Sequence, residues 1–354
     1  MLSTKEVEEL LGEINDPVLN VPLSETEGIA EVKIKEEKEH VSVKLAIGRL
    51  GGQEQLDLQM KVVDILKENG FATVGIRFEE LADDLINEHR GNEASPIESQ
   101  FSDGKTEFIS VASGKGGVGK STVSVNLAVS LAKAGKNVGI IDADIYGFSV
   151  PDMMGIVDKP AVEGEKIIPV ERYGVQVISM AFFVEENTPV IWRGPMLGKM
   201  LTSFFNEVQW GELDYLILDL PPGTGDVALD VHQMLPHSKE IIVTTPHPTA
   251  AFVAARAGSM ALHTDHEIIG VIENMSYFES EVSGQKEYVF GTGGGEKLAA
   301  DLEVPLLGQV PLGQPKWDHD DFAPSIYKDD KISDIYTDIA NSIIAQSKDE
   351  QSKE

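Results

Sequence analysis

The sequence predicts an α/β protein in which a doubly wound, mostly parallel sheet is preceded by a small α+β domain. After residue 107, short apolar runs alternate with helical stretches, as is typical of parallel strands covered by helices on both faces. Before residue 89, segments with the period of half-buried strands alternate with helical segments. The length of 354 residues also accommodates two domains, at about 100–200 residues each.

The first domain is expected over residues 1–88. Its predicted elements are, in order, a helix (5–14), two strands (30–34 and 40–47), a helix (56–66) and a strand (72–78). Residues 89–106 are polar and lack periodicity, so they are interpreted as a linker.

The second domain is expected over residues 107–345. Its predicted strands are 108–112, 138–142, 175–180, 215–219, 240–245, 268–273 and 305–310. Residues 332–344 are expected to form a packing helix, and residues 346–354 a disordered tail. In a sheet of this kind, ligands bind at the carboxyl ends of the strands.

The composition restricts the partners and the compartment. The chain has 29 Lys and Arg against 59 Asp and Glu, for a net charge of −30. Such a charge repels nucleic-acid backbones and anionic membranes. The start of the chain is acidic, and no apolar stretch reaches the roughly 18 residues of a membrane span. The sequence therefore predicts a cytoplasmic protein, without a membrane partner and with nothing that indicates nucleic acid.

The chain contains no cysteine. A disulfide, a thiol nucleophile or a cysteine-ligated iron–sulfur cluster therefore cannot be built from this chain alone.

Residues 113–122 form a glycine-rich segment between the strand 108–112 and a predicted helix, 123–134. They match G-x-x-x-x-G-K-[ST], in which glycines allow backbone N–H groups to surround phosphates and a helix N-terminus adds its positive end. Lys120 is expected to neutralise β- and γ-phosphate charge, and Ser121 to ligate Mg²⁺. The residues expected to contact ATP here are Gly114, Lys115, Gly116, Gly117, Val118, Gly119, Lys120, Ser121 and Thr122.

A dinucleotide-binding loop is the alternative, because the same glycines satisfy G-x-G-x-x-G and Asp142 lies near the offset of a ribose-binding acid. The Lys-Ser pair after the last glycine and the further aspartates Asp144 and Asp219 favour a nucleoside triphosphate with Mg²⁺.

Together, these motifs resemble the MinD/ParA/nitrogenase-iron-protein ATPases, whose deviant phosphate loop carries a second lysine, here Lys115. The segments 142–147, 192–195, 219–226, 274–278 and 290–295 narrow the resemblance to the Mrp/ApbC branch, over about residues 108–312. The first domain resembles the iron–sulfur-assembly domain that often precedes Mrp ATPases.

The resemblance implies a homodimer that holds two ATP molecules and hydrolyses them slowly. It assigns catalytic roles to Lys120 and to Lys115, which would reach the partner's nucleotide. Asp144 would position the attacking water, and Asp142 would support the water shell of Mg²⁺. Mg²⁺ would be held through Ser121, Asp144 and Asp219. Asn274 would contact the adenine edge, and Pro311 would pack against the base.

Ser280 and Ser283 occupy the positions where cluster-carrying Mrp proteins have Cys-x-x-Cys. A serine hydroxyl stays protonated near neutral pH and is a poor iron ligand, so the sequence argues against a cluster held by this chain alone. Three interpretations remain open: the cysteines were replaced by engineering, a natural variant works without a cluster, or ligands come from partners or small thiols.

The sequence thus predicts a dimeric Mg-ATPase whose family role is the binding and transfer of iron–sulfur clusters to apoproteins. The alternative is a cluster-free, ATP-switched regulatory or adaptor protein that acts on a partner protein or on DNA.

Overall fold

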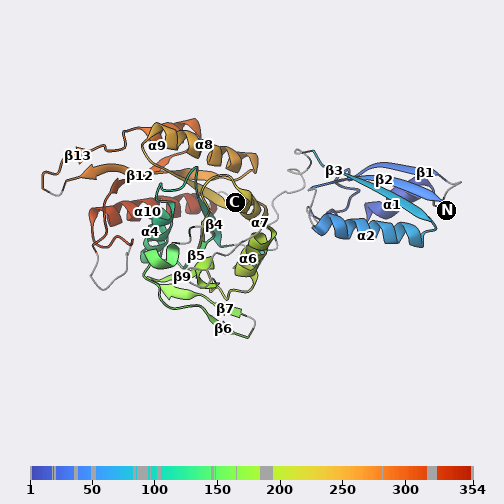
Figure 1. The fold of residues 1–354 in the computed structure, drawn as a ribbon, viewed down its shortest axis with the longest axis horizontal. Helices are drawn as coiled ribbons and strands as arrows, with labels where there is room; N and C mark the ends of the chain where they lie inside the picture. Colours follow the sequence, from blue (N-terminus) through green and yellow to red (C-terminus); the bar gives the residue numbers. More distant parts are fainter. Residues whose placement is uncertain are drawn as a thin grey trace. The chain divides into compact units, whose positions relative to one another are not determined.

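The computed structural model describes most of the chain. The described residues are 2–17, 19, 21–35, 39–48, 53–82, 85, 95, 97–101, 105–144, 147, 149–164, 166–183, 194–280, 282–316 and 325–351. The chain divides into two compact units, residues 1–93 and 94–354 (Figure 1). The predicted domain limits, 1–88 and 107–345, remain predictions.

The first unit is a three-stranded sheet with two helices. The sheet has the order β1 (Ile29–Lys35), β2 (His40–Ile47), β3 (Thr73–Glu80), and β2 pairs antiparallel with β1 and parallel with β3. The helices are α1 (Thr4–Gly12) and α2 (Gln53–Glu68). Ser3 and Glu6 form a capping box at the start of α1, which satisfies two of its free N–H groups. Apolar side chains from both helices and the three strands form one core.

The second unit is built on a nine-stranded, mostly parallel sheet with the order β13-β12-β11-β4-β10-β5-β9-β8, and β14 pairs with β12. Its strands are β4 (Glu107–Ser113), β5 (Val138–Asp142), β8 (Val170–Arg172), β9 (Val175–Ser179), β10 (Tyr215–Asp219), β11 (Lys239–Thr244), β12 (Ile268–Glu279), β13 (Lys286–Glu287) and β14 (Leu306–Leu312). This confirms the doubly wound sheet predicted from the alternating apolar runs.

Helices cover both faces of this sheet, and each face has its own core. One core contains side chains of α6 (Gly194–Asn206), α7 (Asp226–Met234), α8 (Pro248–His263) and α9 (Gly294–Asp301). The other contains side chains of α4 (Lys120–Lys133), α5 (Val150–Met153) and α10 (Lys331–Gln351). Figure 1 shows α8 and α9 on one side of β12, and α4 and α10 on the other.

Three features differ from the sequence-based expectations. Strands β8 and β13 pair antiparallel at the ends of the sheet, and β6 (Ala161–Glu163) and β7 (Lys166–Ile168) form a separate hairpin. These strands are short, so they leave little periodicity in the sequence. Within the expected linker, Ile97 and Phe101 pack against the core of the second unit around the 3-10 helix η2 (Glu98–Gln100).

The third difference is the C-terminal helix, which continues to Gln351 although a disordered tail was expected from residue 346. The Ser347 hydroxyl is buried there and donates to Glu107 Oε2 at 2.8 Å. Tertiary contacts therefore extend the helix beyond its last apolar residues. None of the helices that the structure describes is long and apolar enough to cross a membrane.

Candidate nucleotide-binding site

Three polar residues end neighbouring parallel strands at the same level. Asp219 at the end of β10 is the register partner of Asp142 at the end of β5, which in turn pairs with Ser179 at the end of β9. All three side chains are buried. The register therefore gathers polar groups at the carboxyl edge of the sheet, where open α/β sheets bind ligands.

The phosphate loop connects β4 to α4 beside this edge. Gly117 (φ 80°) and Gly119 (φ 82°) have left-handed backbone conformations, which residues with a Cβ rarely adopt. A Cβ at Gly114 would overlap the backbone of Val253 and Ala254 in α8, so glycine is required for that close approach. The loop is thus fixed by backbone conformation and by packing.

Asp219 is the centre of the hydrogen-bond network below the loop. Lys120 Nζ donates to Asp219 Oδ1 at 2.7 Å, and the pair is almost completely buried. Ser121 Oγ donates to Asp219 Oδ2 at 2.6 Å, and Ser124 Oγ to Oδ1 at 2.6 Å. The structure therefore brings together the lysine, the hydroxyl and the carboxylate that the motif predicts.

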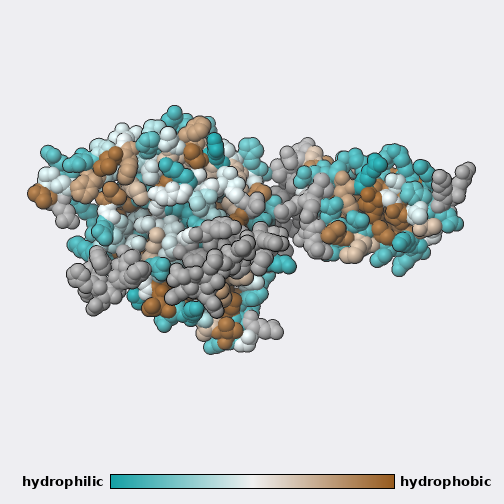
Figure 2. Space-filling model, viewed as in Figure 1, coloured by the Kyte–Doolittle hydropathy of each residue, from teal (hydrophilic) through white to brown (hydrophobic). Residues whose placement is uncertain are grey.

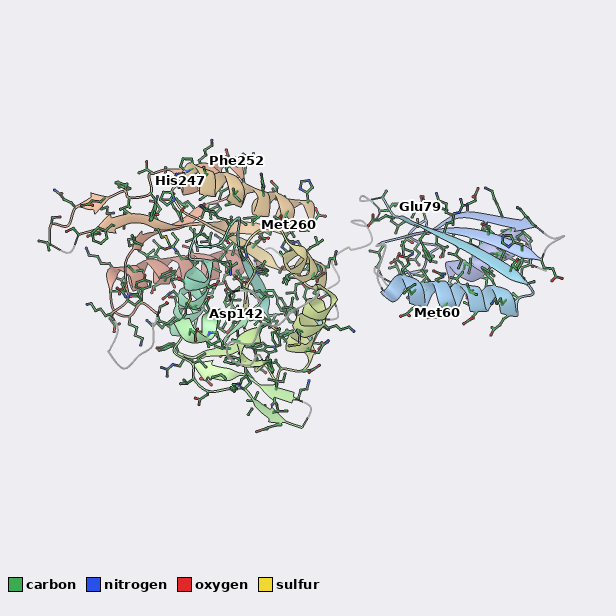
Figure 3. All side chains as sticks on the ribbon, in the orientation of Figure 1. Met60, Glu79, Asp142, His247, Phe252 and Met260 are labelled. Carbon is green, nitrogen blue, oxygen red and sulfur yellow. The ribbon has the colours of Figure 1, made fainter. Side chains whose placement is uncertain are left out.

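Asp142 accepts hydrogen bonds on both carboxylate oxygens. Its Oδ1 accepts from Asp144 N at 3.3 Å, and its Oδ2 accepts from Ser149 N, Val150 N and Ser179 Oγ at 3.0–3.2 Å. Burial, followed by the charge of Asp219, raises the pKa of Asp142 to about 7. Figure 3 shows Asp142 inside the second unit.

Asp144 and Lys115 lie nearer the surface. Asp144 is half-buried on the loop after β5, and its carboxylate packs against Gly147. Lys115 is exposed, while its backbone carbonyl accepts from Ser113 Oγ at 3.2 Å. The roles implied for both residues stay predictions.

Asn274 and Pro311 lie on the paired strands β12 and β14. Asn274 Nδ2 donates to the Val118 carbonyl of the phosphate loop at 2.9 Å. The register partner of Asn274 is Val310, next to Pro311. Met275 has a positive φ of 56°, a strained conformation for a residue other than glycine, and the register with β14 shifts between Asn274 and Phe278. The structure thus places Asn274 against the loop, and its contact with adenine stays a prediction.

The segment after Asp219 also contacts the phosphate loop. Gly223 N donates to the Ser113 carbonyl at 2.8 Å, and Gly223 has a φ of 91°. α7 begins three residues later, at Asp226. This backbone hydrogen bond therefore joins the phosphate loop to the segment that leads into α7.

Ser280 and Ser283 lie in the turn between β12 and β13. The Ser280 hydroxyl accepts from Ser283 N and the Ser283 hydroxyl accepts from Gln285 N, each at 3.3 Å. Both serines therefore stabilise a turn. Several large apolar side chains near this hairpin are exposed, and Figure 2 shows hydrophobic surface at its tip, on the left. They are Phe278, Val282, Tyr288, Val289 and Phe290.

Three residues with hydrogen bonds at or beside the site, two serines and a glutamate, were not indicated by the sequence motifs. Ser124 and Ser179 each donate to one of the two buried aspartates. Glu273 accepts from Gly295 N at 2.6 Å and from Gln309 Nε2 at 2.9 Å, which joins β12 to α9 and β14. Ser124 could have been found from its position one helical turn after Ser121. The contacts of Ser179 and Glu273 depend on strand pairing, which the sequence does not show.

The donor set suits Mg²⁺, because Ser121 Oγ and the Asp219 carboxylate are hard oxygen ligands in contact beside a phosphate loop. Among the residues that the structure describes, no group of three His, Asp or Glu side chains is arranged to hold a metal. Residues 145 and 146 of the segment 142–147, and residues 192 and 193 of the segment 192–195, lie outside the residues that the structure describes.

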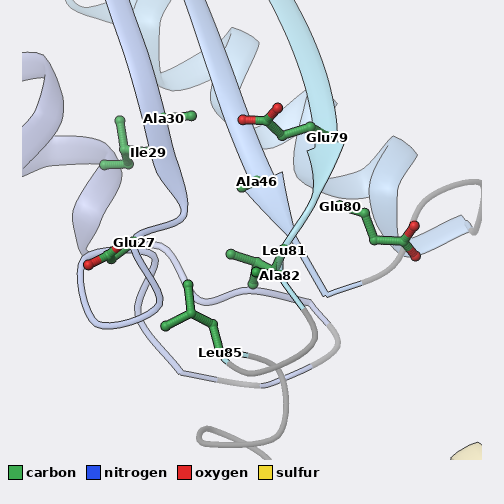
Figure 4. Close-up of a pocket in the computed structure, with 9 residues that line it drawn as sticks. All are labelled: Glu27, Ile29, Ala30, Ala46, Glu79, Glu80, Leu81, Ala82 and Leu85. Atoms are coloured by element: carbon green, nitrogen blue, oxygen red, sulfur yellow. The ribbon is translucent and has the colours of Figure 1, made fainter. Parts of the chain in front are cut away.

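A separate pocket of about 560 Å³ lies in the first unit (Figure 4). Its lining combines apolar side chains such as Ile29 and Leu81 with Glu27, Glu79 and Glu80. None of the site residues expected from the sequence lines it.

The phosphate loop, the buried Lys120–Asp219 pair and the parallel sheet covered by helices define a P-loop NTPase. Residues 105–344 match the family model described as NUBPL iron-transfer P-loop NTPase, of the ParA group. The chain belongs to this family.

Named relatives and a solved structure agree with this assignment. The chain is 62% identical over 347 residues to the iron-sulfur cluster carrier protein of Bacillus subtilis, covering 98% of this chain and 99% of the relative. It is 42% identical to the protein of the same description from Mycobacterium bovis, over 85% of this chain and 82% of that one. The nucleotide-binding protein of Archaeoglobus fulgidus in complex with ADP is 37% identical, with a TM-score of 0.51, over 67% of this chain and 87% of that one.

Proposed function

We propose that this protein binds and slowly hydrolyses Mg-ATP as a homodimer in the cytoplasm, and acts on apoprotein clients in iron–sulfur protein maturation. The observation that carries the proposal is the contact of Lys120 and Ser121 with the Asp219 carboxylate under the phosphate loop. The names of the relatives support the process, and the ADP in the Archaeoglobus fulgidus protein supports the ligand.

Each residue has a distinct task in this proposal. Lys120 places positive charge at the β- and γ-phosphates, and Lys115 adds charge from the partner protomer where the leaving phosphoryl group becomes negative. Asp144 orients the attacking water. Ser121, Asp219 and Asp144 hold Mg²⁺, which neutralises phosphate charge when bound. Because Asp219 engages both Lys120 and Ser121, Mg-ATP binding would redistribute these contacts.

The serine pair makes the cluster step differ from cysteine-based carriers. Ser280 and Ser283 are committed to turn hydrogen bonds, and hydroxyl oxygens are poor ligands for iron in a transferable cluster. We therefore propose that an iron–sulfur cargo, where it is handled, takes its ligands from a client or a small thiol. A cluster-free, ATP-switched adaptor is the second candidate, and the cysteine-free sequence favours it.

The two lysines of the loop provide a matched test. Lys120→Gln can still donate to Asp219 but lacks the charge, so ATP affinity should fall roughly 10- to 100-fold, as for loss of a hydrogen bond to a charged group. Lys115→Gln should bind ATP within about twofold of wild type but lose hydrolysis. Equilibrium binding of a fluorescent ATP analogue and phosphate release measure both.

Unchanged ATP affinity in Lys120→Gln would contradict the assignment of the phosphate loop. Full hydrolysis by Lys115→Gln would contradict its role across the dimer. Light scattering with Mg-ATP should give twice the mass of one chain, and a monomer during turnover would contradict the homodimer.

A further inference from the structure

The carboxylate of Asp142 closes the loop that carries Asp144. One oxygen, Oδ1, accepts from the backbone N–H of Asp144 at 3.3 Å, at the start of the loop. The other, Oδ2, accepts from the backbone N–H groups of Ser149 and Val150 at 3.1 and 3.2 Å, where the chain enters α5. A single side chain thus holds both ends of this loop.

Ser179 adds the one side-chain donor among the four hydrogen bonds that the described residues make to that carboxylate, beside three backbone N–H groups. Its hydroxyl lies on the neighbouring strand β9, in register with Asp142, and is fully buried. Ser179 Oγ accepts from Ala181 N at 3.1 Å, so the lone pair facing Ala181 is used and its own proton is directed to Asp142 Oδ2 at 3.0 Å. This hydrogen bond restricts rotation of the Asp142 carboxylate about its Cβ–Cγ bond.

Both oxygens of Asp142 are occupied by donors from the protein. Three of these four donors lie on Oδ2, and they come from the entrance to α5 and from β9. Asp219, in contrast, contacts Lys120 and Ser121 directly beneath the phosphate loop. The two buried aspartates therefore contact different segments: Asp142 contacts the loop after β5, and Asp219 contacts the first turn of α4.

We propose that Ser179 and Asp142 form a positioning pair for ATP hydrolysis: Ser179 orients Asp142, and Asp142 holds the loop that presents Asp144 to the attacking water. The inference rests on the proposed ATPase function. Neither residue needs to touch the nucleotide. The pair acts on the geometry of Asp144, so it affects the chemical step more than it affects ATP binding.

Ser110 offers a matched control for the removal of a hydroxyl. It is also a fully buried serine in the same sheet, on β4, and its Oγ has no hydrogen-bond partner among the described residues. Ser179→Ala and Ser110→Ala therefore make the same chemical change at similar burial. Ser179→Cys keeps the shape of the side chain with a slightly larger atom and replaces the hydroxyl by a weak S–H donor, and it serves if the alanine variant does not fold.

In the full-length protein, Ser179→Ala should lower kcat about tenfold while KM and the dissociation constant of a fluorescent ATP analogue change less than about twofold. Amide exchange at Asp144, Ser149 and Val150, whose N–H groups donate to Asp142, should become faster, with or without nucleotide. Ser179→Cys should change kcat and exchange in the same direction, and Ser110→Ala should match wild type in every measurement.

An unchanged kcat in Ser179→Ala, or equal losses in kcat and ATP affinity, would overturn the positioning role. Unchanged exchange at Asp144, Ser149 and Val150 would overturn the proposed hold on the two ends of the loop. Absence of hydrolysis in the wild type would instead refute the proposed ATPase function, so the two failures are distinguishable.

Discussion

Glu98 is a buried carboxylate, and its partner is the imidazole of His237. Glu98 Oε2 lies 3.0 Å from His237 Nδ1, and Oε1 accepts from His237 N at 2.9 Å. Burial alone would raise the pKa of Glu98, but hydrogen bonds from His237 and Ser95 outweigh burial and lower it. The hydrogen bond to Glu98 raises the pKa of His237. The pair ties the segment around η2 to the residues that follow α7.

This pair predicts a pH-dependent stability. His237 contributes fully below its ordinary pKa of 6.5, and this contribution is lost as the pH rises through its raised pKa. Glu98 contributes above its ordinary pKa of 4.5, and this is lost as the pH falls through its lowered pKa. The melting temperature should therefore drop more in His237→Gln at pH 5.5 than at pH 8.5.

The control is the same substitution in a Glu98→Gln background, where the effect of His237→Gln should no longer depend on pH. A difference between wild type and His237→Gln that stays constant from pH 5.5 to 8.5 would contradict the charged pair.

Individual site residues could be predicted where the chemistry follows from local spacing. Lys120 and Ser121 are adjacent in the loop motif, and Asp219 ends an apolar strand, so their convergence was foreseeable. Ser179 was not, because its contact with Asp142 depends on which strand lies beside β5. Glu98 and His237 likewise meet through folding of distant segments, which no local pattern reports.

The C-terminal helix α10 is anchored by polar as well as apolar contacts. Ser347 Oγ donates to Glu107 and lies 3.2 Å from the Tyr215 hydroxyl. Earlier in the same helix, Tyr336 is buried in the core, and its hydroxyl has no hydrogen-bond partner in the part of the chain that the structure describes. One helix therefore carries a satisfied and an unsatisfied buried hydroxyl.

Opposite effects are expected from removing these two hydroxyls. Ser347→Ala should lower the free energy of unfolding by about 1–2 kcal/mol, because it removes a buried donor to Glu107 and the hydroxyl next to Tyr215. Tyr336→Phe should raise it by up to about 1 kcal/mol, because it removes an uncompensated polar atom. All three tryptophans lie in the second unit, so denaturant unfolding followed by tryptophan fluorescence measures this unit. Equal destabilisation by both substitutions would contradict the hydrogen-bond assignment.

The secondary structure of the second unit was largely predictable because its central strands are short, continuous apolar runs. Strands 138–142 and 215–219 have the predicted limits, and β12 extends six residues beyond its prediction through Glu279. The extension begins with Asn274, Met275 and Ser276, where polar residues and a positive φ interrupt the apolar pattern. Pairing with β14 sustains the strand there, and pairing is a tertiary property.

The second unit combines the phosphate loop of a P-loop NTPase with a hairpin that has serines where cluster carriers have cysteines. The family, the sheet and the Lys120–Asp219 pair indicate nucleotide binding. The hydroxyls of Ser280 and Ser283 accept backbone hydrogen bonds within the turn between β12 and β13. A cysteine-containing carrier has the residues for nucleotide binding and for cluster ligation in one chain. This chain has the residues for nucleotide binding but not the cysteines for cluster ligation.

Anaerobic reconstitution with iron and sulfide tests that difference, followed by visible absorbance and by bound iron per dimer. The chain as it stands should bind no iron above background, whereas the double variant Ser280→Cys and Ser283→Cys should bind a cluster, because thiolates are the soft ligands that iron–sulfur clusters require. Both proteins should bind ATP equally. A stable cluster on the cysteine-free chain would contradict the proposal that its own side chains do not ligate one.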